Sequence, residues 1–161
     1  MSDSEISIRD YQPGDFPAVL EVWEATGLGG AHRGDDATVI ERTLACGGRF
    51  LVLEVPARGT VIGTAWLTCD ARRFYLHHVG VLPSHQRRGL GARLTAAAQA
   101  IARERGLQIK LEVHRDNHTA REIYRRAGFA PLGEYDVLID RTTGSPAAAA
   151  VICLDPGKER R

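Results

Sequence analysis

The sequence predicts an α/β (α+β) domain in which one mixed sheet carries helices on both faces. Segments with the two-residue alternation of strands are intermixed with segments whose apolar residues follow helical spacing. Two strand signals, residues 50–55 and 61–69, are joined by Pro56-Ala57-Arg58-Gly59, which is typical of a hairpin. Because a hairpin pairs its strands antiparallel, an all-parallel sheet is excluded and a mixed sheet is expected.

The N-terminal half is expected to contain a strand, two helices and three further strands. Ile6-Ser7-Ile8-Arg9 alternates as a strand does, and Pro13-Gly14-Asp15-Phe16 opens a helix that ends at the glycines of 27–30. Val39, Ile40 and Leu44 indicate a second helix, which Gly47-Gly48 ends. Three strands are expected after it, over residues 50–55, 61–69 and 73–81.

The C-terminal half is expected to alternate two helices with three strands. A helix over residues 91–105 has apolar residues at helical spacing, and Gly106 follows it as a C-terminal stop. A second helix begins at Asn117 or Thr119 and ends at Ala127. The expected strands of this half are 107–113, 129–135 and 148–154.

Length and composition indicate one soluble domain. The chain has 161 residues, 43% hydrophobic and 25% charged, which excludes collagen-like, disulfide-scaffold and disordered proteins. We expect a single domain over residues 5–154, with flexible termini at 1–4 and 155–161. A net charge of +1 argues against nucleic acid as a partner, and no apolar run approaches the roughly 18 residues that span a membrane.

The cysteines and histidines indicate a cytoplasmic protein without a metal site. Cys46, Cys69 and Cys153 are odd in number, lack CxxC spacing and lie in mostly apolar surroundings, so we expect three reduced thiols. The acidic, polar N-terminus does not resemble a signal peptide. The six histidines show no paired metal-ligand spacing with the cysteines.

A glycine-rich turn between a strand and a long helix is the sharpest local signal. It reads Gln86-Arg87-Arg88-Gly89-Leu90-Gly91-Ala92, and GxxxxGK[ST] is absent. Amides at a helix N-terminus have no helical acceptor and, with the helix dipole, form an anion site. Glycines at 89 and 91 let a phosphate approach the backbone, and Arg87 and Arg88 add positive charge. Glycines that only allow tight helix–strand packing are the alternative.

Two stretches resemble one protein family. Gln86-Arg87-Arg88-Gly89-Leu90-Gly91 resembles the Q/R-x-x-G-x-G/A acyl-CoA signature of the GNAT N-acetyltransferase superfamily. Residues 117–129, from Asn117 through Tyr124 to Gly128-Phe129, are similar to that family's N-x-x-A-x-x-x-Y-x-x-x-G-F stretch. The strand–helix order matches over about residues 5–154. The resemblance implies a GNAT fold: a mostly antiparallel sheet of six to seven strands flanked by about four helices, splayed between the fourth and fifth strands.

The resemblance also implies acetyl-CoA as the co-substrate and assigns its contacts. Pyrophosphate would bind the amides of residues 87–92, and the pantetheine arm would pair with Val79 and Val81 at the splay. Asn117 would bind the same arm, although an N-cap role suits asparagine equally. The implied cofactor-binding residues are Val79, Val81, Gln86, Arg87, Arg88, Gly89, Leu90, Gly91, Ala92, Asn117 and Tyr124.

Two residues are candidates for the proton transfers of an acyl transfer to an amine. Tyr124 holds the family's tyrosine position and is the expected general acid, because a phenol is protonated at pH 7; packing against Phe129 is its alternative role. His77 is the expected base, since imidazole titrates near neutrality and residues 73–81 contain no carboxylate. Strand alternation places His77 with Val79 and Val81 and directs His78 to the other face, in a structural role. A base acting through water, or no dedicated base, stays open.

The acceptor side is less defined by the sequence. Family members build it from the first two helices and their loop, which implies Trp23, Asp35 and Asp36 as substrate residues here; solvated loop charge is the alternative for both carboxylates. The expected acceptor is a small-molecule amine or a protein amine, in a monomer or homodimer of bacterial origin. A non-catalytic module that binds acyl-CoA is the alternative function.

Overall fold

The computed structural model describes residues 6–29, 34–134 and 136–140. The strands are β1 (Ser7–Asp10), β2 (Arg49–Val55), β3 (Thr60–Cys69), β4 (Arg73–Val81) and β5 (Gln108–Leu111). The α-helices are α1 (Phe16–Thr26), α2 (Ala37–Ala45), α3 (Leu90–Glu104) and α4 (His118–Arg126), and short 3₁₀ turns span Pro13–Asp15, Pro56–Arg58 and Pro83–His85.

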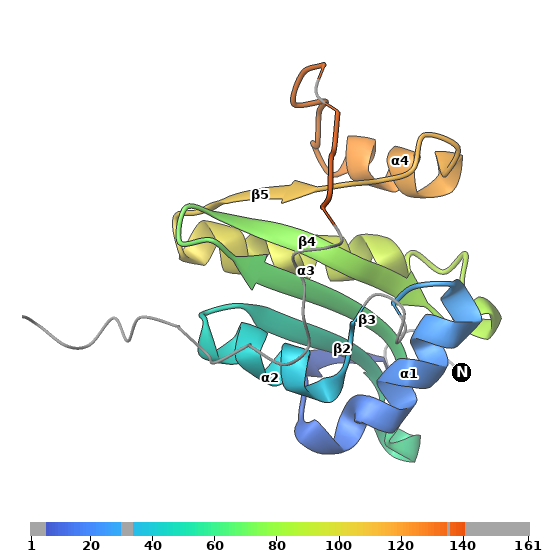
Figure 1. Ribbon diagram of the computed structural model, residues 1–161. Helices are drawn as coiled ribbons and strands as arrows, with labels where there is room; N and C mark the ends of the chain where they lie inside the picture. The colour runs from blue at the N-terminus through green and yellow to red at the C-terminus, as the bar shows by residue number, and fades with distance from the viewer. Residues whose placement is uncertain (1–5, 30–33, 135, 141–161) are drawn as a thin grey trace, which may run out of the picture.

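The described strands form one mixed sheet in the order β1-β2-β3-β4-β5. Strands β1 to β4 pair antiparallel, whereas β4 and β5 pair parallel. Helices α1 and α2 cover one face of this sheet and α3 covers the other, with α4 following β5 (Figure 1). The expectation of a mixed, mostly antiparallel sheet with four flanking helices is therefore confirmed.

The number of strands differs from the expected six to seven. Residues 129–134 form no strand, and Leu132 is 71% exposed. Pro131 lacks an amide donor and Gly133 weakens a strand, so the apolar residues around them do not build a paired element. The expected strand 148–154 lies outside the described residues, as do the termini 1–4 and 155–161. The domain limits 5–154 stay a prediction.

Two apolar cores hold the sheet between its helices. Under α3 the core includes Leu53, Phe74 and Leu94, all buried. Under α1 and α2 it is aromatic and includes Trp23, Phe50 and Trp66, with stacked indole rings whose centroids are 6.0 Å apart. The residues of β4 that interrupt regular pairing pack against this second core.

The cysteines differ from expectation. Cys46 is disulfide-bonded and Cys69 carries a free thiol, so the prediction of three reduced thiols is wrong at Cys46. The reasoning from odd number and spacing failed because pairing depends on which cysteines the fold brings together. Cys153 lies outside the described residues.

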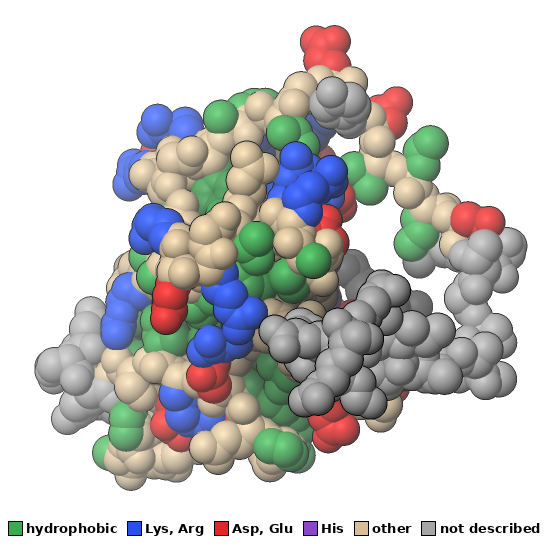
Figure 2. Space-filling view, turned by 90° about the vertical axis from the view of Figure 1, so that its left-hand side faces the viewer, with side chains coloured by type: hydrophobic (Ala, Val, Ile, Leu, Met, Phe, Trp, Pro, Cys, Tyr) green, Lys and Arg blue, Asp and Glu red, His purple; other side chains and the backbone are tan. Residues whose placement is uncertain are grey.

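Within the described ranges, none of the helices is long and apolar enough to cross a bilayer. The cytoplasmic location stays a prediction. On the face shown in Figure 2, Lys and Arg side chains are separated by acidic, apolar and other polar groups. The expectation that nucleic acid is not a partner stays a prediction.

Candidate functional site

Strand β4 separates from β5 halfway along its length. The parallel register runs only from Arg73, opposite Gln108, to Leu76, opposite Leu111, where β5 ends. Beyond Leu76 the two strands diverge (Figure 1), so main-chain groups of β4 face no strand partner on this side in the described sheet. This is the splay between the fourth and fifth strands that the sequence led us to expect. Unpaired main-chain groups in a sheet need another partner.

A β-bulge interrupts β4 in the splayed stretch. Thr64 of β3 pairs with Gly80 and Trp66 pairs with His77, so two steps along β3 correspond to three along β4. His78 has a φ of 48°, a left-handed conformation that is uncommon for a residue other than glycine. The hydroxyl of Thr64 donates to the His78 carbonyl oxygen at 2.8 Å and accepts from Trp23 Nε1 at 3.2 Å. A buried hydrogen-bond chain thus holds the bulge.

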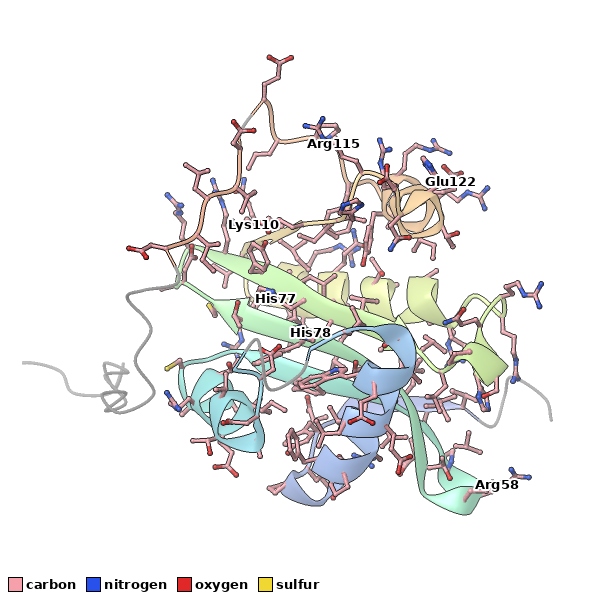
Figure 3. All side chains as sticks on the ribbon, turned by 45° about the vertical axis from the view of Figure 1, so that its right-hand side comes forward. Arg58, His77, His78, Lys110, Arg115 and Glu122 are labelled. Atoms are coloured by element: carbon pink, nitrogen blue, oxygen red, sulfur yellow. The ribbon has the colours of Figure 1, made fainter. Side chains whose placement is uncertain are left out.

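The bulge changes which side chains share a face. Val79 and Val81 pack on the core beneath α3, whereas His77 and His78 both contact Trp66 on the opposite face, with ring centroids 6.2 and 5.3 Å from it. Figure 3 shows the two labelled imidazoles as neighbours along β4. The expectations that His77 shares a face with Val79 and Val81, and that His78 points away from His77, are therefore wrong. The extra residue of the bulge shifts the alternation by one.

His78 is bound by a carboxylate from the loop that precedes α2. Its Nε2 lies 3.1 Å from Asp35 Oδ2, and the two side chains are 11% and 14% exposed. The ring also packs 4.8 Å from the ring of Trp23. An imidazole between two indoles and a carboxylate has little freedom to change rotamer. The structure therefore joins Asp35, one of the expected substrate residues, to a histidine for which only a structural role was expected.

His77 is held in a more buried setting. Its Nε2 lies 3.0 Å from Thr68 Oγ1, and its ring stacks on Tyr75 with centroids 4.0 Å apart. Burial, with smaller effects from the charges of His78 and Lys110, lowers the pKa of His77 to about 4. The imidazole is therefore neutral at physiological pH, and it is a weaker base than the sequence suggested.

The low pKa of His77 predicts a pH dependence of stability. Its pKa is about 4 in the folded chain and 6.5 ordinarily, so between these values the unfolded chain binds more protons. This part of the stability is complete above pH about 6.5 and is lost as the pH falls toward 4, by about 3 kcal/mol at most. Urea unfolding of wild type and His77→Gln between pH 8 and 4 should show a smaller loss in the variant. Equal losses would contradict the burial argument.

The turn before α3 has the geometry of an anion site. Arg87 and Gly89 adopt left-handed φ values of 61° and 72°, which turns successive amides toward one side. The first α3 amide with a backbone acceptor in the described chain is Arg93, which donates to Gly89 at 3.0 Å. A Cβ built on Gly89 would meet nothing within 4 Å. The space above the turn is therefore open to a ligand.

The other expected cofactor residues support this turn in different ways. Gln86 donates from Nε2 to the Val81 carbonyl at 2.9 Å and so fixes the turn to the end of β4. Leu90 is 2% exposed and anchors the first turn of α3 in the core, so only its amide is available. Gly91 faces Ile123 of α4, Ala92 is exposed and Arg88 is half-buried.

Tyr124 lies on α4 and is largely buried against its neighbours. Its ring meets Phe129 edge to face with centroids 5.7 Å apart, and it packs on the core beneath α3. Burial raises the pKa of Tyr124, so the phenol is protonated at neutral pH. No described residue hydrogen-bonds its Oη. The packing role is thus present, and the hydroxyl stays available as a donor.

Two further expected residues act as helix caps. Asn117 Oδ1 accepts from the Ala120 amide at 3.1 Å at the start of α4, which confirms its N-cap role. Asp36 Oδ1 accepts from the Val39 amide at 2.8 Å and caps α2 in the same way. Trp23 is 1% exposed, so it lies beneath the site and acts through its contact with His78.

Sequence reasoning missed the residues that support β4 from its neighbours. Thr64 and Thr68 of β3 hold the two histidines, and Lys110 Nζ lies 4.4 Å from the Tyr75 ring centroid. Burial and a hydrogen bond to Glu112 raise the pKa of Tyr75. Nothing in the sequence marks these residues, because threonines in strands are common and their partners come from other elements. No cluster that could hold a metal ion occurs among the described side chains.

Comparisons with known proteins agree on a family. A family model described as acetyltransferase (GNAT) family matches residues 16–129. A mycothiol acetyltransferase of Clavibacter sepedonicus is 39% identical over 80 residues, which cover 49% of this chain and 26% of that protein. The N-alpha-acetyltransferase RimI of Mycobacterium tuberculosis is 37% identical over 79 residues, 47% of this chain and 49% of RimI. The matches thus span only a quarter to a half of these relatives.

A solved structure shows the same fold. The PaiA N-acetyltransferase from Thermoplasma acidophilum in complex with coenzyme A superposes with a TM-score of 0.68. It is 21% identical, and the match covers 81% of this chain and 91% of that one.

Proposed function

The chain belongs to the GNAT acetyltransferase family, and on that premise we propose that it is an acetyl-CoA-dependent N-acetyltransferase. It transfers the acetyl group to a primary amine by direct attack in a ternary complex. The observation that carries the proposal is the continuity of two features: the splayed half of β4 leads directly into the open amide turn of α3. The extended pantetheine arm and the pyrophosphate of acetyl-CoA need these two features side by side.

The donor site fits acetyl-CoA, which supplies the activated thioester. Amides of residues 87–92 hold the pyrophosphate at the α3 N-terminus, where the helix dipole favours negative charge. On the side of β4 that β5 leaves unpaired beyond Leu76, the main chain of Val79 and the amide of Val81 pair with the pantetheine arm, while the Val81 carbonyl accepts from Gln86. The amide near Val79 polarises the thioester carbonyl as charge develops on its oxygen. Arg87 and Arg88 add positive charge around the phosphates.

Tyr124 is the general acid in this proposal. It donates the proton of Oη to the departing thiolate, and its raised pKa keeps the phenol protonated until that step. Asn117 fixes the start of α4 through its N-cap hydrogen bond. The rest of its side chain contacts the pantetheine arm in this proposal. The base lies on the face of β4 that carries the two histidines.

The acceptor is an amine of a small molecule or of a protein. The names of two relatives support this breadth, since one is a mycothiol acetyltransferase and the other an N-alpha-acetyltransferase. Asp35 and Asp36, which precede α2, are the carboxylates proposed to attract the amine. The monomer or homodimer state and a bacterial, cytoplasmic setting remain part of the proposal.

Tyr124→Phe tests the proposal, because it keeps the ring on Phe129 and removes only the hydroxyl. Acetyl transfer to a panel of amines is measured by detecting the thiol that is released. We expect kcat to fall about 100-fold while the affinity for coenzyme A stays the same. Unchanged turnover would contradict the role of Tyr124. Coenzyme A binding by the wild type without turnover of any amine would instead identify a non-catalytic acyl-CoA-binding module.

A further inference from the structure

We infer that Lys110 selects the acceptor: it favours an amine whose molecule also carries an anionic group, about 10 Å from the nitrogen that is acetylated. The inference rests on the proposed function and names the substrate class of that reaction. The class comprises peptides with a free α-amine and an acidic side chain a few residues further on, and ω-amino acids of similar length. The distribution of charge along one face of β4 carries the inference.

The face of β4 that carries Tyr75 is positive at the start of the strand. The parallel register places Lys110 beside Tyr75 and Gln108 beside Arg73. Lys110 is exposed with Nζ 4.4 Å from the Tyr75 ring centroid, and Arg73 Nε donates to Gln108 Oε1 at 2.9 Å. None of the ion pairs found among the described residues includes Lys110 or Arg73. Two cations therefore meet here without a carboxylate that neutralises them.

The same face is negative toward the splay. Asp35 Oδ2 lies 3.1 Å from His78 Nε2, next to Val79, where the thioester carbonyl is proposed to lie. Glu112 follows β5 at the point where β4 and β5 diverge, and its carboxylate accepts a hydrogen bond from the Tyr75 hydroxyl. An ammonium group is favoured near these carboxylates and an anion near Lys110. The charges thus orient a molecule that carries one group of each sign.

A row of rings connects the two ends. The ring of His77 stacks on Tyr75 with centroids 4.0 Å apart, and the centroids of His77 and His78 are 6.3 Å apart. Figure 3 shows the labelled side chains of Lys110, His77 and His78 in succession across the sheet. The positive charge of Lys110 contributes to the lowered pKa of His77, so its field acts along this row.

The length of the row fixes the spacing of charges in the acceptor. Tyr75, which lies level with Lys110, precedes His78 by three positions and Val79 by four. A strand rises about 3.3 Å per residue, so the anionic group lies roughly 10–13 Å from the reacting amine. An extended peptide has the same rise, and an acidic side chain on its third or fourth residue reaches Lys110. A diamine of that length would instead place its second ammonium against two cations.

Two matched pairs of acceptors test the inference. One pair is the tetrapeptide amides Ala-Ala-Glu-Ala and Ala-Ala-Lys-Ala, and the other is ω-aminooctanoate and diaminooctane. We expect the wild type to favour the acidic member of at least one pair by about tenfold in kcat/KM, because that member gains an ion pair and the other brings like charges together. The pair that shows the preference distinguishes a peptide from a small molecule. The preference should shrink as salt is raised from about 20 mM to about 500 mM.

Substitutions of Lys110 assign the preference to its charge. Lys110→Arg should keep the preference, Lys110→Gln should reduce it to within about threefold, and Lys110→Glu should reverse it. Arg58→Glu makes the same change of charge at the turn between β2 and β3, far from Lys110 (Figure 3), and should retain the wild-type preference. Coenzyme A affinity, measured by calorimetry, should be the same in all four variants, because the donor site contains neither residue.

Equal kcat/KM values of the wild type for both members of each pair would overturn the role of Lys110. A preference that Lys110→Glu leaves unchanged, or that Arg58→Glu reverses equally, would overturn it as well. These results would leave the proposed acetyl transfer intact. Absence of turnover by the wild type with all four acceptors and with the wider amine panel would overturn the proposed function together with this inference.

Discussion

Replacement of Gly89 by glutamate is expected to abolish binding of coenzyme A, with a rise in Kd of at least about 1,000-fold. Gly89 caps α3 at a φ of 72°, and a side chain there would extend into the open space above the amide turn. A carboxylate in that space would stand where the pyrophosphate binds. It would also compete for the same amides and the same positive end of the helix. Isothermal titration with coenzyme A measures the effect.

Gly106 provides a matched control at the other end of α3. Its φ is 65° and a Cβ there also meets nothing within 4 Å, so Gly106→Glu introduces the same charge and similar backbone strain. We expect Gly106→Glu to lower stability by about 1–2 kcal/mol and leave the affinity for coenzyme A unchanged. Gly89→Gln separates charge from size, and its loss should be smaller than that of Gly89→Glu. Equal affinities of Gly89→Glu and wild type would exclude this turn as the phosphate site.

Much of the fold could be predicted because local signals and tertiary structure agree. Hairpin residues 56–59 join β2 and β3 as expected, and Gly89 and Gly106 flank α3 at left-handed φ values. The turn before α3 could also be predicted, since a glycine-rich turn before a helix places amides by local geometry alone. That this turn binds the pyrophosphate stays a prediction. The expected strand at 129–135 failed where Pro131 and Gly133 oppose the apolar pattern.

The arrangement around the β4 bulge could not be predicted because its contacts join residues far apart in the chain. The bulge in β4 depends on Thr64, which in turn binds Trp23 across 41 positions. His78 meets Asp35 across 43 positions. A two-residue alternation assumes regular pairing, so it assigned every residue after His77 to the wrong face. The burial that weakens His77 as a base is likewise a property of the folded chain.

The importance of the bulge can be tested at Thr64, which is fully buried and has no assigned step in the proposed reaction. Thr64→Val replaces the hydroxyl by a methyl group of similar size and leaves both the His78 carbonyl and Trp23 Nε1 without their partner. Each buried polar group that loses its hydrogen bond costs about 1–3 kcal/mol. We therefore expect the free energy of unfolding to fall by about 2–6 kcal/mol in urea titrations.

Thr64→Ser is the matched control, because it keeps the hydroxyl and removes only one methyl group, at a cost of about 1 kcal/mol. In the folded fraction, Thr64→Val should also lower kcat by at least about tenfold, since relaxation of the bulge displaces both His78 and the Val79 amide. Thr64→Ser should stay within about threefold of wild type. A larger loss of stability or activity in Thr64→Ser than in Thr64→Val would contradict this expectation. It would mean that packing of the methyl group, and not the hydrogen-bond chain from Trp23, holds the bulge of β4.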